Sequence, residues 1–508
     1  MKSLYKTVKI MSLAVLTLSL SNCTDELTTN SSTAISEETI LSSTNQLNIV
    51  LNSVYKYILM GDNGSGSQND ACFAGLPGYC MYYDLTGADI MSTTNYGGSP
   101  EMCYRAAPER TQSTGDYSKR IWVNMYKAIN QANIILDALP DATGEDSEKN
   151  DLKGQCLAIR GICYFNLIMN YQQTYAIAKD KRGVILRTSS SDPESMGFST
   201  VQQCYDQILK DLKEAKTLLA GYDRTDMWRL NADVVSGQLA RVYQVMGDWS
   251  NALSEAKSVY DKYNTLMTEN EWYSGFDNFL TDGCKEVIWG VKYTNLTNIS
   301  SNTEFNYWYN QDPSYGEGMT DGPIYCFINL LVDGKYVELF DDGDYRGRRC
   351  DKTTGVTDAD VKNVMFWHRT NNGDSETRRK WAYNKFKYYG DANGAKQGNT
   401  YPELPLMRGS EMLLLMAEAE ANQGNTGTAL SYLTTLQSAR NVANLTTTTF
   451  KDDLLEAIYV ERRKELLGEG VTGMYDLLRL QKPLYRYGSS STNPAGHYSW
   501  GMMYLDNF

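Results

Sequence analysis

Three glutamates near the C-terminus are the first residues whose spacing could do chemistry. Glu461, Glu465 and Glu469 recur at every fourth position, which would place their carboxylates on one face of a helix. Such a face could supply paired carboxylates for general acid–base catalysis. Basic residues at positions 462–464 stand among them, and ion pairs at i, i+3 and i+4 stabilise helices modestly. The sequence therefore favours a structural helix over a catalytic one.

Other catalytic or metal-binding constellations have less support. Glycoside hydrolysis needs two carboxyl groups roughly 5 to 10 Å apart across a cleft, and nothing singles out such a pair among the 61 acidic residues. His368 and His497 have no nucleophile motif near them and are too few for a His-rich zinc site. Asp341, Asp342 and Asp344 could offer oxygens to Ca²⁺, but a solvated acidic turn is favoured. We predict no catalytic residue, no metal and no cofactor.

Aromatic side chains offer a different chemistry, the binding of a solute without reaction. The chain has 37 Tyr and 9 Trp residues, whose flat apolar faces and polar edges suit stacking on sugar rings. Asn, Asp or Arg beside them would bond the sugar hydroxyls. A tyrosine-rich core would give the same composition, so each aromatic residue could instead be buried. The candidate ligand-binding residues are Tyr82, Tyr83, Asn95, Tyr96, Tyr104 and Arg105, and further along the chain Tyr307, Trp308, Tyr309 and Tyr315.

These candidates fall in two long irregular blocks. Residues 61–115 are dense in Gly, Asn, Ser and Tyr, and residues 261–404 interleave Trp and Tyr with Gly, Asn and Asp. Short strands are expected in the second block at residues 286–293 and 381–388. Irregular stretches of this length inside a compact chain are usually functional. A rigid scaffold that displays two such loop regions is typical of a binding protein.

The elements that must position the two blocks are helices. Between residues 231 and 260, small residues and Tyr243 follow the spacing of a tetratricopeptide repeat, with Gly247 at the turn between its two helices. A second pair of similar pattern spans residues 409–440. A generic helical hairpin at each place is the alternative, and pairs so far apart in sequence form no simple tandem solenoid. Four further helices are expected at residues 47–60, 120–139, 152–171 and 201–219.

The N-terminal residues form an export signal. Lysines precede an apolar run at residues 10–20. This run is too short to span a bilayer, which needs about 20 apolar residues, but it has the length of a secretory signal. Leu20-Ser21-Asn22-Cys23 resembles the lipobox of bacterial lipoproteins, in which the cysteine is acylated, although Gly, Ala or Ser usually stands at the Asn22 position. An ordinary cleavable signal with a chance cysteine is the alternative.

These patterns define the expected domain organisation. A stretch rich in Ser, Thr and Asn follows Cys23, and such a composition cannot bury enough surface to fold alone. No later segment is apolar enough to cross a membrane. The expected parts are a signal peptide (1–22), a lipidated flexible tether (23–45) and one domain (46–508), which comprises a helical scaffold (46–260, with loop block 61–115), an aromatic-rich ligand region (261–404) and a C-terminal helical part (405–508).

Charge and cysteines limit the partners and the core. The formal net charge is −13, and loss of the signal peptide's lysines makes the mature chain more acidic. Such a surface repels phosphate backbones, so no nucleic acid is expected as a partner. Cys156 and Cys163 stand in a helical pattern and are expected in the core. A Cys72–Cys80 disulfide is possible because the protein is exported.

Several segments together resemble the SusD/RagB family of nutrient-binding lipoproteins, and the resemblance runs nearly the whole chain. The most specific segment is similar to the family's ERR-x-EL helix, which EG and then DL-x-R follow. Two consecutive helices in the first third of the chain also agree. The matching segments are RGSEMLLLMAEA (408–419), ERRKEL (461–466), EG (469–470) and DLLR (476–479), together with Trp122, Tyr126, Ile129, Asn133, Arg160, Gly161, Tyr164, Phe165 and Leu167.

The resemblance implies a fold, a partner and a location. Family members are mostly helical, with tetratricopeptide-like pairs that pack against a SusC-like, TonB-dependent outer-membrane transporter. They act as a lid that takes a glycan or, in the RagB branch, an oligopeptide. The acidic residues after Cys23 resemble a signal for display on the cell exterior. A surface glycoside hydrolase and a peptide-binding adaptor are the alternatives. Many members end in an Asn-Pro-rich segment, whereas this chain ends YLDNF.

Overall fold

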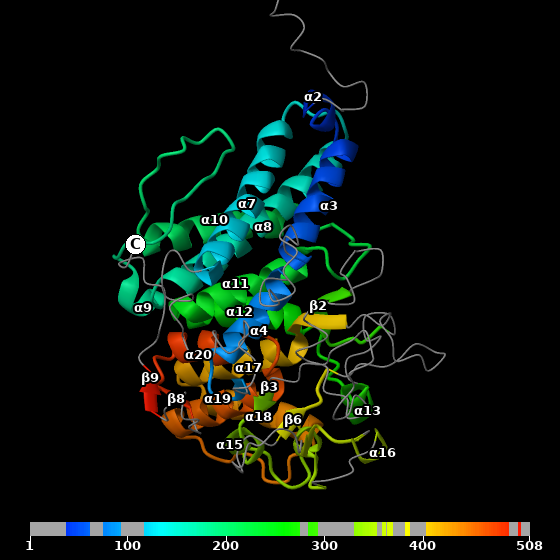
Figure 1. The fold of residues 1–508 in the computed structure, drawn as a ribbon, viewed down its shortest axis with the longest axis vertical. Helices are drawn as coiled ribbons and strands as arrows, with labels where there is room; N and C mark the ends of the chain where they lie inside the picture. Colours follow the sequence, from blue (N-terminus) through cyan, green and yellow to red (C-terminus); the bar gives the residue numbers. More distant parts are fainter. Residues whose placement is uncertain are drawn as a thin grey trace, which may run out of the picture.

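Helices dominate the structure, and each packs against the next along one stack. The computed structural model describes residues 37–60, 75–92, 116–274, 283–292, 330–352, 358–361, 363–368, 381–386, 403–486 and 496–498. The stack runs in the order α7 (Asp116–Ala138), α8 (Asp146–Tyr171), α10 (Val201–Leu218), α11 (Ala232–Met246), α12 (Trp249–Tyr260) and α17 (Gly409–Asn422) (Figure 1). The mostly helical fold predicted from the sequence is confirmed.

Two helix pairs lie side by side although they are far apart in the sequence. The first is α11 with α12, and the second is α17 with α18 (Thr426–Ala439). Gly247 and Gly424 stand at their turns with φ of 74° and 87°, a left-handed conformation that glycine adopts without strain. Because α12 packs directly on α17, the two pairs form neighbouring layers. Sequence separation therefore did not keep the pairs apart in space.

The other helices surround this stack. Those expected at residues 47–60 and 201–219 are present, and Thr200 and Gln203 form a capping box at the start of α10. One short helix, α2 (Glu37–Ile40), lies inside the range expected as a tether, and α3 (Thr44–Met60) already begins within that range. Within the described residues, no helix is long and apolar enough to cross a membrane. The remaining helices are α2 (Glu37–Ile40), α3 (Thr44–Met60), α4 (Gly75–Leu85), α9 (Tyr175–Ala178), α13 (Glu269–Tyr273), α15 (Gly334–Val337), α16 (Asp358–Val361), α19 (Lys451–Leu466), α20 (Gly473–Arg479) and the 3-10 turn η3 (Tyr345–Gly347).

Within the described residues, short strands form one five-stranded sheet and two strand pairs. The strands expected near residues 286–293 and 381–388 are both present. The sheet follows the order β1 (Ile90–Ser92), β3 (Leu330–Val332), β6 (Trp381–Tyr383), β5 (Phe366–His368) and β4 (Arg349–Cys350). The pairs are β2 (Val287–Lys292) with β7 (Glu403–Arg408), and β8 (Leu484–Arg486) with β9 (Gly496–Tyr498), both antiparallel.

The aromatic residues of the second block that the structure describes belong to the core. Trp272, Trp289 and Trp367 are each at most 5% exposed. Three cationic groups lie over the ring of Trp272, at 5.1 Å for Lys385, 5.2 Å for Arg440 and 5.5 Å for Arg408. Such cation–π contacts help to compensate desolvated charges. Trp272 therefore stabilises the interior and cannot stack on a solute. The expectation that Cys156 and Cys163 are core residues is also confirmed.

A buried ionic network surrounds the end of α19, in the lower half of the molecule as Figure 1 shows it. Glu465 accepts hydrogen bonds from Arg346, Arg408 and Arg440 at 2.8 to 3.0 Å. The network also reaches the β2–β7 pair, through Glu286 and Arg408, and the five-stranded sheet, through Lys385 just after β6. Its five cationic and five anionic side chains balance: Arg346, Lys385, Arg408, Arg440 and Lys464 with Glu286, Asp344, Glu461, Glu465 and Glu469.

This network corrects the interpretation of the three glutamates. Glu469 lies beyond the end of α19 at Leu466, so the three carboxylates do not share one helical face. The Lys464–Glu461 pair at i, i+3 exists, at 3.0 Å, but most partners come from distant segments. Spacing alone suggested local ion pairs because the sequence does not show which arginines approach the helix. The structural role of these glutamates is confirmed. The local i, i+3 pair is only a small part of the ion pairing that gives them this role.

The arginines keep the central carboxylate ionised. Burial by itself would raise the pKa of Glu465, but the guanidinium groups of Arg440 and Arg408 hold that pKa well below its ordinary range. Removing one member of such a network leaves its partners buried without a counter-charge, which is strongly destabilising. An intact network is therefore important for the stability of the fold.

We expect Glu465→Gln to lower the free energy of unfolding by about 3 to 5 kcal/mol at pH 7, because three buried arginines lose their shared counter-charge. Urea denaturation measures the change. The difference from the unsubstituted chain should shrink as the pH falls through the depressed pKa of Glu465, because the stabilisation that its ionised form supplies is then lost. The control Asp261→Asn removes the exposed pair with Lys257 and should cost less than about 0.5 kcal/mol. Equal losses in both variants would contradict the prediction.

Candidate functional site

The five-stranded sheet joins the two irregular blocks. β1 lies in the first block and β3 in the second, and they pair antiparallel with Ser92 opposite Leu330. The segment 93–115 begins directly after Ser92, and the segment 293–329 ends directly before Leu330, so both segments attach at the same end of the β1–β3 pair. Candidate residues Asn95 and Tyr96 follow closely after Ser92. The structure therefore brings the described ends of the two blocks together.

The β2–β7 pair repeats this arrangement at a second place. Lys292, the last described residue before the segment 293–329, is paired with Glu403, the first described residue after the segment 387–402. Both segments therefore attach at neighbouring residues on this strand pair. Each also attaches at its other end to the five-stranded sheet, through Leu330 and through Phe386 just after β6. Each of these two segments is thus attached at both ends to residues in or just after paired strands.

Among the candidate ligand residues, the structure describes the side chain of Tyr83 alone. It lies on α4, is 7% exposed, and its hydroxyl accepts a 2.5 Å hydrogen bond from the Asn170 side-chain amide. Tyr82 lies on the same helix. The candidates that lie outside the described residues are Asn95, Tyr96, Tyr104 and Arg105 in the first block and Tyr307, Trp308, Tyr309 and Tyr315 in the second, together with the expected lipidation site Cys23.

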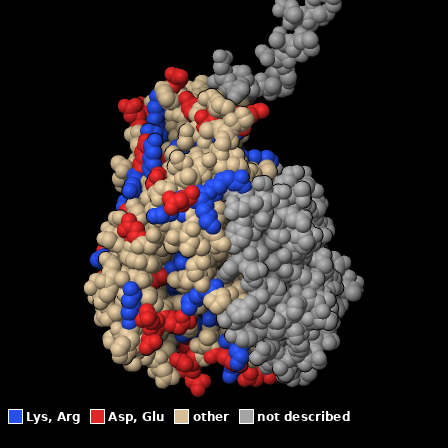
Figure 2. Space-filling model, turned by 90° about the vertical axis from the view of Figure 1, so that its left-hand side faces the viewer, with Lys and Arg blue, Asp and Glu red and all other residues tan. Residues whose placement is uncertain are grey.

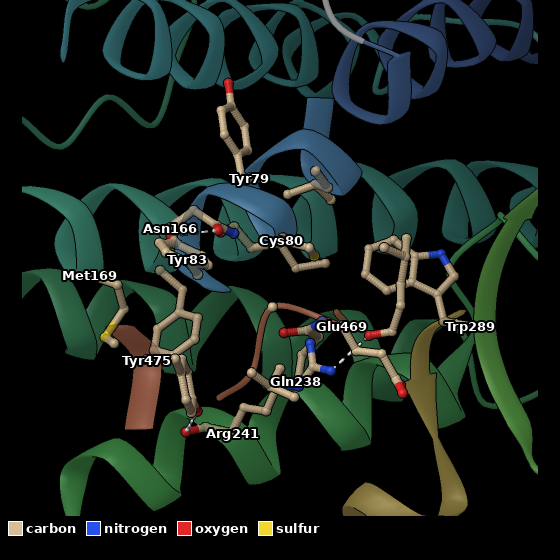
Figure 3. A pocket seen from close by; sticks show the side chains of 16 residues that line it. Tyr79, Cys80, Tyr83, Asn166, Met169, Gln238, Arg241, Trp289, Glu469 and Tyr475 are labelled. Carbon is tan, nitrogen blue, oxygen red and sulfur yellow. Dashed lines mark hydrogen bonds between the residues drawn. The ribbon is translucent and has the colours of Figure 1, made fainter. Parts of the chain in front are cut away.

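A small cavity separates α4 from α11. Figure 3 shows Cys80 and Tyr83 on one side of it, with Gln238 and Arg241 on the other. Its volume is about 60 Å³, well below the roughly 300 Å³ at which small-molecule pockets begin. This space suits a few ordered waters. The cavity therefore cannot hold a sugar ring.

The charged groups around the cavity are already paired. The Arg241 guanidinium donates two 2.6 Å hydrogen bonds to the Glu411 carboxylate and one of 2.7 Å to the Leu406 carbonyl. Glu469 accepts from Lys385 and Arg408 at 2.6 to 2.9 Å. A general base needs a lone pair that faces the substrate, and these carboxylates direct theirs to cations. The cavity wall is therefore structural.

The acidic turn before η3 divides into two kinds of residue. Asp342 is exposed, as the solvated turn predicted. Asp344 is 2% exposed and accepts two hydrogen bonds from the Arg346 guanidinium, at 2.9 and 2.7 Å, so the solvated interpretation is wrong for this residue. Among the described residues, no group of three or more His, Cys, Asp or Glu side chains could hold a metal ion.

The described part of the face in Figure 2 carries charges of both signs. Figure 2 shows Lys and Arg interspersed with Asp and Glu over the described part of one face. Exposed pairs such as Lys257–Asp261 and Lys335–Glu338, at 2.8 and 2.6 Å, are examples of this mixture. Long-range attraction of a polyanion requires a basic patch. Recognition through aromatic and hydrogen-bonding groups suits such a surface better.

Sequence reasoning missed the residues that hold the two blocks in place. Asp84 and Lys385 are 1% and 0% exposed, and both bond to the residues that follow α19. Asp89 bonds to Arg463 on α19 itself. None of the three stands in a motif or a periodic segment. The one available signal is a charged residue beside apolar ones in an otherwise Gly- and Tyr-rich block, and that signal does not identify its partner.

Family models match two parts of the chain. Residues 84–244 match the model SusD-like_3, described as "Starch-binding associating with outer membrane". Residues 351–501 match the model SusD_RagB, described as "SusD family". Together these matches include α7, α8, α10 and the C-terminal helices. No curated protein matches the chain.

Solved structures are similar over most of the length. A SusD-like carbohydrate-binding protein from Bacteroides vulgatus is 28% identical with a TM-score of 0.71, and the match covers 88% of this chain and 86% of that one. A SusD superfamily protein from Bacteroides thetaiotaomicron is 23% identical, with a TM-score of 0.67 and coverage of 89% and 92%. A laminarin-binding SusD-like protein is 20% identical, with a TM-score of 0.65 and coverage of 87% and 92%. The last two likenesses concern the fold alone.

Cys80 provides a test of the cavity wall. Burial raises the pKa of its thiol to about 12, and the thiol is free, so the Cys72–Cys80 disulfide that the sequence allowed is not formed. Because the thiolate is the reactive form, iodoacetamide at pH 8 should alkylate Cys80 slowly in the folded chain, although faster than the fully buried Cys163, since Cys80 is only partly buried. Both should react rapidly in urea without reductant. Mass spectrometry measures the labelling; protection of Cys80 in urea would contradict the free thiol.

Proposed function

Because this chain belongs to the SusD/RagB family, we propose that it is an outer-membrane lipoprotein that binds a glycan at the cell surface and passes it to a SusC-like, TonB-dependent transporter. It binds its ligand and leaves it chemically unchanged. In this proposal, aromatic rings place the sugar, and polar side chains beside them bond its hydroxyls. The ligand-binding residues are sought in the two irregular blocks, among the candidates named above.

One observation carries the proposal: the described ends of the two aromatic-rich blocks meet in one sheet. A glycan site needs several aromatic and polar groups that converge on one ligand. Two blocks more than a hundred residues apart could not supply such a site if they lay on opposite faces. The antiparallel pairing of β1 with β3 supports their convergence. Rigid elements that carry variable loops are a common basis of binding sites.

The choice of a glycan rests on chemistry and on the relatives. The chain is rich in Tyr and Trp, and one family model is described as starch-binding. One similar structure is a carbohydrate-binding protein and another binds laminarin. A hydrolytic function finds less support, because the acidic residues at the described cavity are engaged by cations. An oligopeptide ligand, as in the RagB branch, is the alternative.

A binding screen tests the function. The mature chain with Cys23→Ser, which cannot be acylated, is titrated calorimetrically with starch, laminarin and other oligosaccharides and with a mixture of oligopeptides. Saturable binding of a glycan without release of shorter products supports the proposal. Binding of peptides alone would select the RagB-type alternative, and product release would select a glycoside hydrolase. A detergent extract of the native membrane should also yield the chain together with a large β-barrel protein.

We expect Trp308→Ala to weaken the affinity for the glycan found in this screen by at least about tenfold, because the sugar would no longer cover the apolar face of the ring, and burial of an aromatic side chain contributes roughly 1.5 to 3 kcal/mol. Isothermal titration calorimetry measures the affinity. Phe198→Ala is the matched control, because Phe198 is an exposed aromatic residue (41%) outside both blocks. Unchanged affinity in the Trp308 variant would remove that residue from the site.

We expect Cys23→Ser to move the chain from the membrane fraction to the soluble fraction, because acyl chains on Cys23 are the proposed anchor. Fractionation of cells followed by immunoblotting measures the distribution. Cys163→Ser is the control, since its buried thiol on α8 cannot carry an acyl chain into a bilayer. A Cys23 variant that stays in the membrane fraction even after a salt wash would contradict the proposed anchor.

A further inference from the structure

The six residues after α19 contact both irregular blocks. We call residues 467–472 the anchor loop; it connects α19 to α20. Gly468 and Gly470 within it have φ of 89° and 74°, the left-handed region that glycine adopts readily. These turns fold the backbone so that its amides face α4 and a carbonyl faces the end of β6. The anchor loop is therefore shaped to bind two neighbours at once.

The first block is attached through Asp84 on α4. One carboxylate oxygen of Asp84 accepts hydrogen bonds from the Gly468 and Gly470 amides, at 2.9 and 3.1 Å, and the other accepts from the Thr472 hydroxyl at 3.0 Å. A β-carbon on Gly470 would lie 2.4 Å from the Cys80 α-carbon, so the backbones of α4 and the loop are in direct contact. Three hydrogen bonds and this close packing fix α4 in place.

The second block is attached through Lys385, directly after β6. The Lys385 ammonium group donates to the Leu467 carbonyl at 2.9 Å, the Glu469 carboxylate at 2.7 Å and the Glu465 carbonyl at 2.8 Å. All three of its protons are therefore engaged. Lys385 is fully buried, so the energy of losing these partners is large. The end of β6 cannot move without the anchor loop.

The two attachments are adjacent in the loop. Lys385 binds at positions 467 and 469, and Asp84 binds at 468, 470 and 472. A shift of the loop that relieves one set of bonds therefore strains the other. The ammonium group of Lys385 also acts electrostatically on the Asp84 carboxylate. Groups that share a rigid backbone segment in this way are expected to be energetically coupled.

We infer that the anchor loop couples the positions of the two irregular blocks, which makes Asp84 and Lys385 positioning residues for ligand binding. The link to the ligand rests on the proposed function, in which both blocks contact one glycan. The coupling between the blocks does not depend on that function. If the blocks bind one ligand together, a change at either attachment alters the geometry of the whole site. Displacements of about 1 Å far from a reactive or binding centre can have large effects.

The coupling is tested without ligand by hydrogen–deuterium exchange of the mature chain carrying Cys23→Ser. Lys385→Met should accelerate exchange of α4 amides in the first block, and Asp84→Ala should accelerate exchange at residues 381–386 in the second. Asp84→Asn keeps one oxygen for the two glycine amides and should restore most of the protection. Faster exchange confined to the block that carries each substitution would overturn the inference.

A matched control separates coupling from general loss of stability. Asp211 is 1% exposed and forms two hydrogen bonds with Arg160, at 2.8 and 2.7 Å, on α10 and α8. Asp211→Asn should accelerate exchange on those helices without affecting α4 and residues 381–386 selectively. Were the control to reproduce the pattern of the Lys385 variant, the exchange would report global unfolding and the inference would fail.

The effect on binding is measured with laminarin as the probe. Asp84→Ala and Lys385→Met should each weaken binding by about tenfold, and the double variant should be little weaker than the worse single one. Additive losses would overturn the coupling. If the parent chain binds no laminarin but the exchange results hold, the choice of glycan is at fault and the coupling stands.

Discussion

Ten charged side chains can leave water together only if each finds a partner, and this requirement organises the lower half of the molecule. A buried carboxylate or guanidinium that lacks a counter-charge costs several kcal/mol. Glu465 shares its oxygens among three arginines, and these come from η3, the end of β7 and the end of α18. Helix α19 therefore sets the position of every segment that supplies a partner. The network fixes elements that helical packing alone would leave free to slide.

The same constraint holds the described ends of the two irregular blocks, which the proposed function places at one site. The scaffold packs as helical layers, but the blocks attach through strands and single polar side chains. Arg408 links β7 to Glu465 and Glu469, and Lys385 links β6 to the residues just after α19. The ends of the blocks are therefore rigid wherever the network reaches them. Variable loops on fixed ends allow a family to change its ligand while it keeps its fold.

The division of the aromatic residues follows from their surroundings. In the second block, Trp272 lies among three cations and Trp289 packs in the core, where its indole N–H donates to the Trp228 carbonyl at 2.9 Å. In the scaffold, the hydroxyls of Tyr126 and Tyr164 bond to the backbone of Ile185 and Arg187 and hold that extended segment against α7 and α8. Composition raises the prospect of sugar binding, but many of these rings are structural.

The sequence by itself determined the helical fold and its family, because both depend on local patterns. Periodicity located α3, α8 and α10, and glycines marked the turns of both helix pairs. The C-terminal segments that carry the family resemblance contain several of the buried ion-paired residues, including Arg408 with Glu465 and Arg462 with Asp476. Such segments are specific because a substituted charge would leave its partner buried alone.

Only the tertiary structure decided which distant residues meet. Asp84 bonds to the loop after α19, and β1 pairs with β3, across separations that no periodicity encodes. A charged residue in sequence shows neither its burial nor its partner, because both depend on how all the elements pack. For the same reason the spacing of Glu461, Glu465 and Glu469 suggested a shared helical face that the end of α19 at Leu466 prevents.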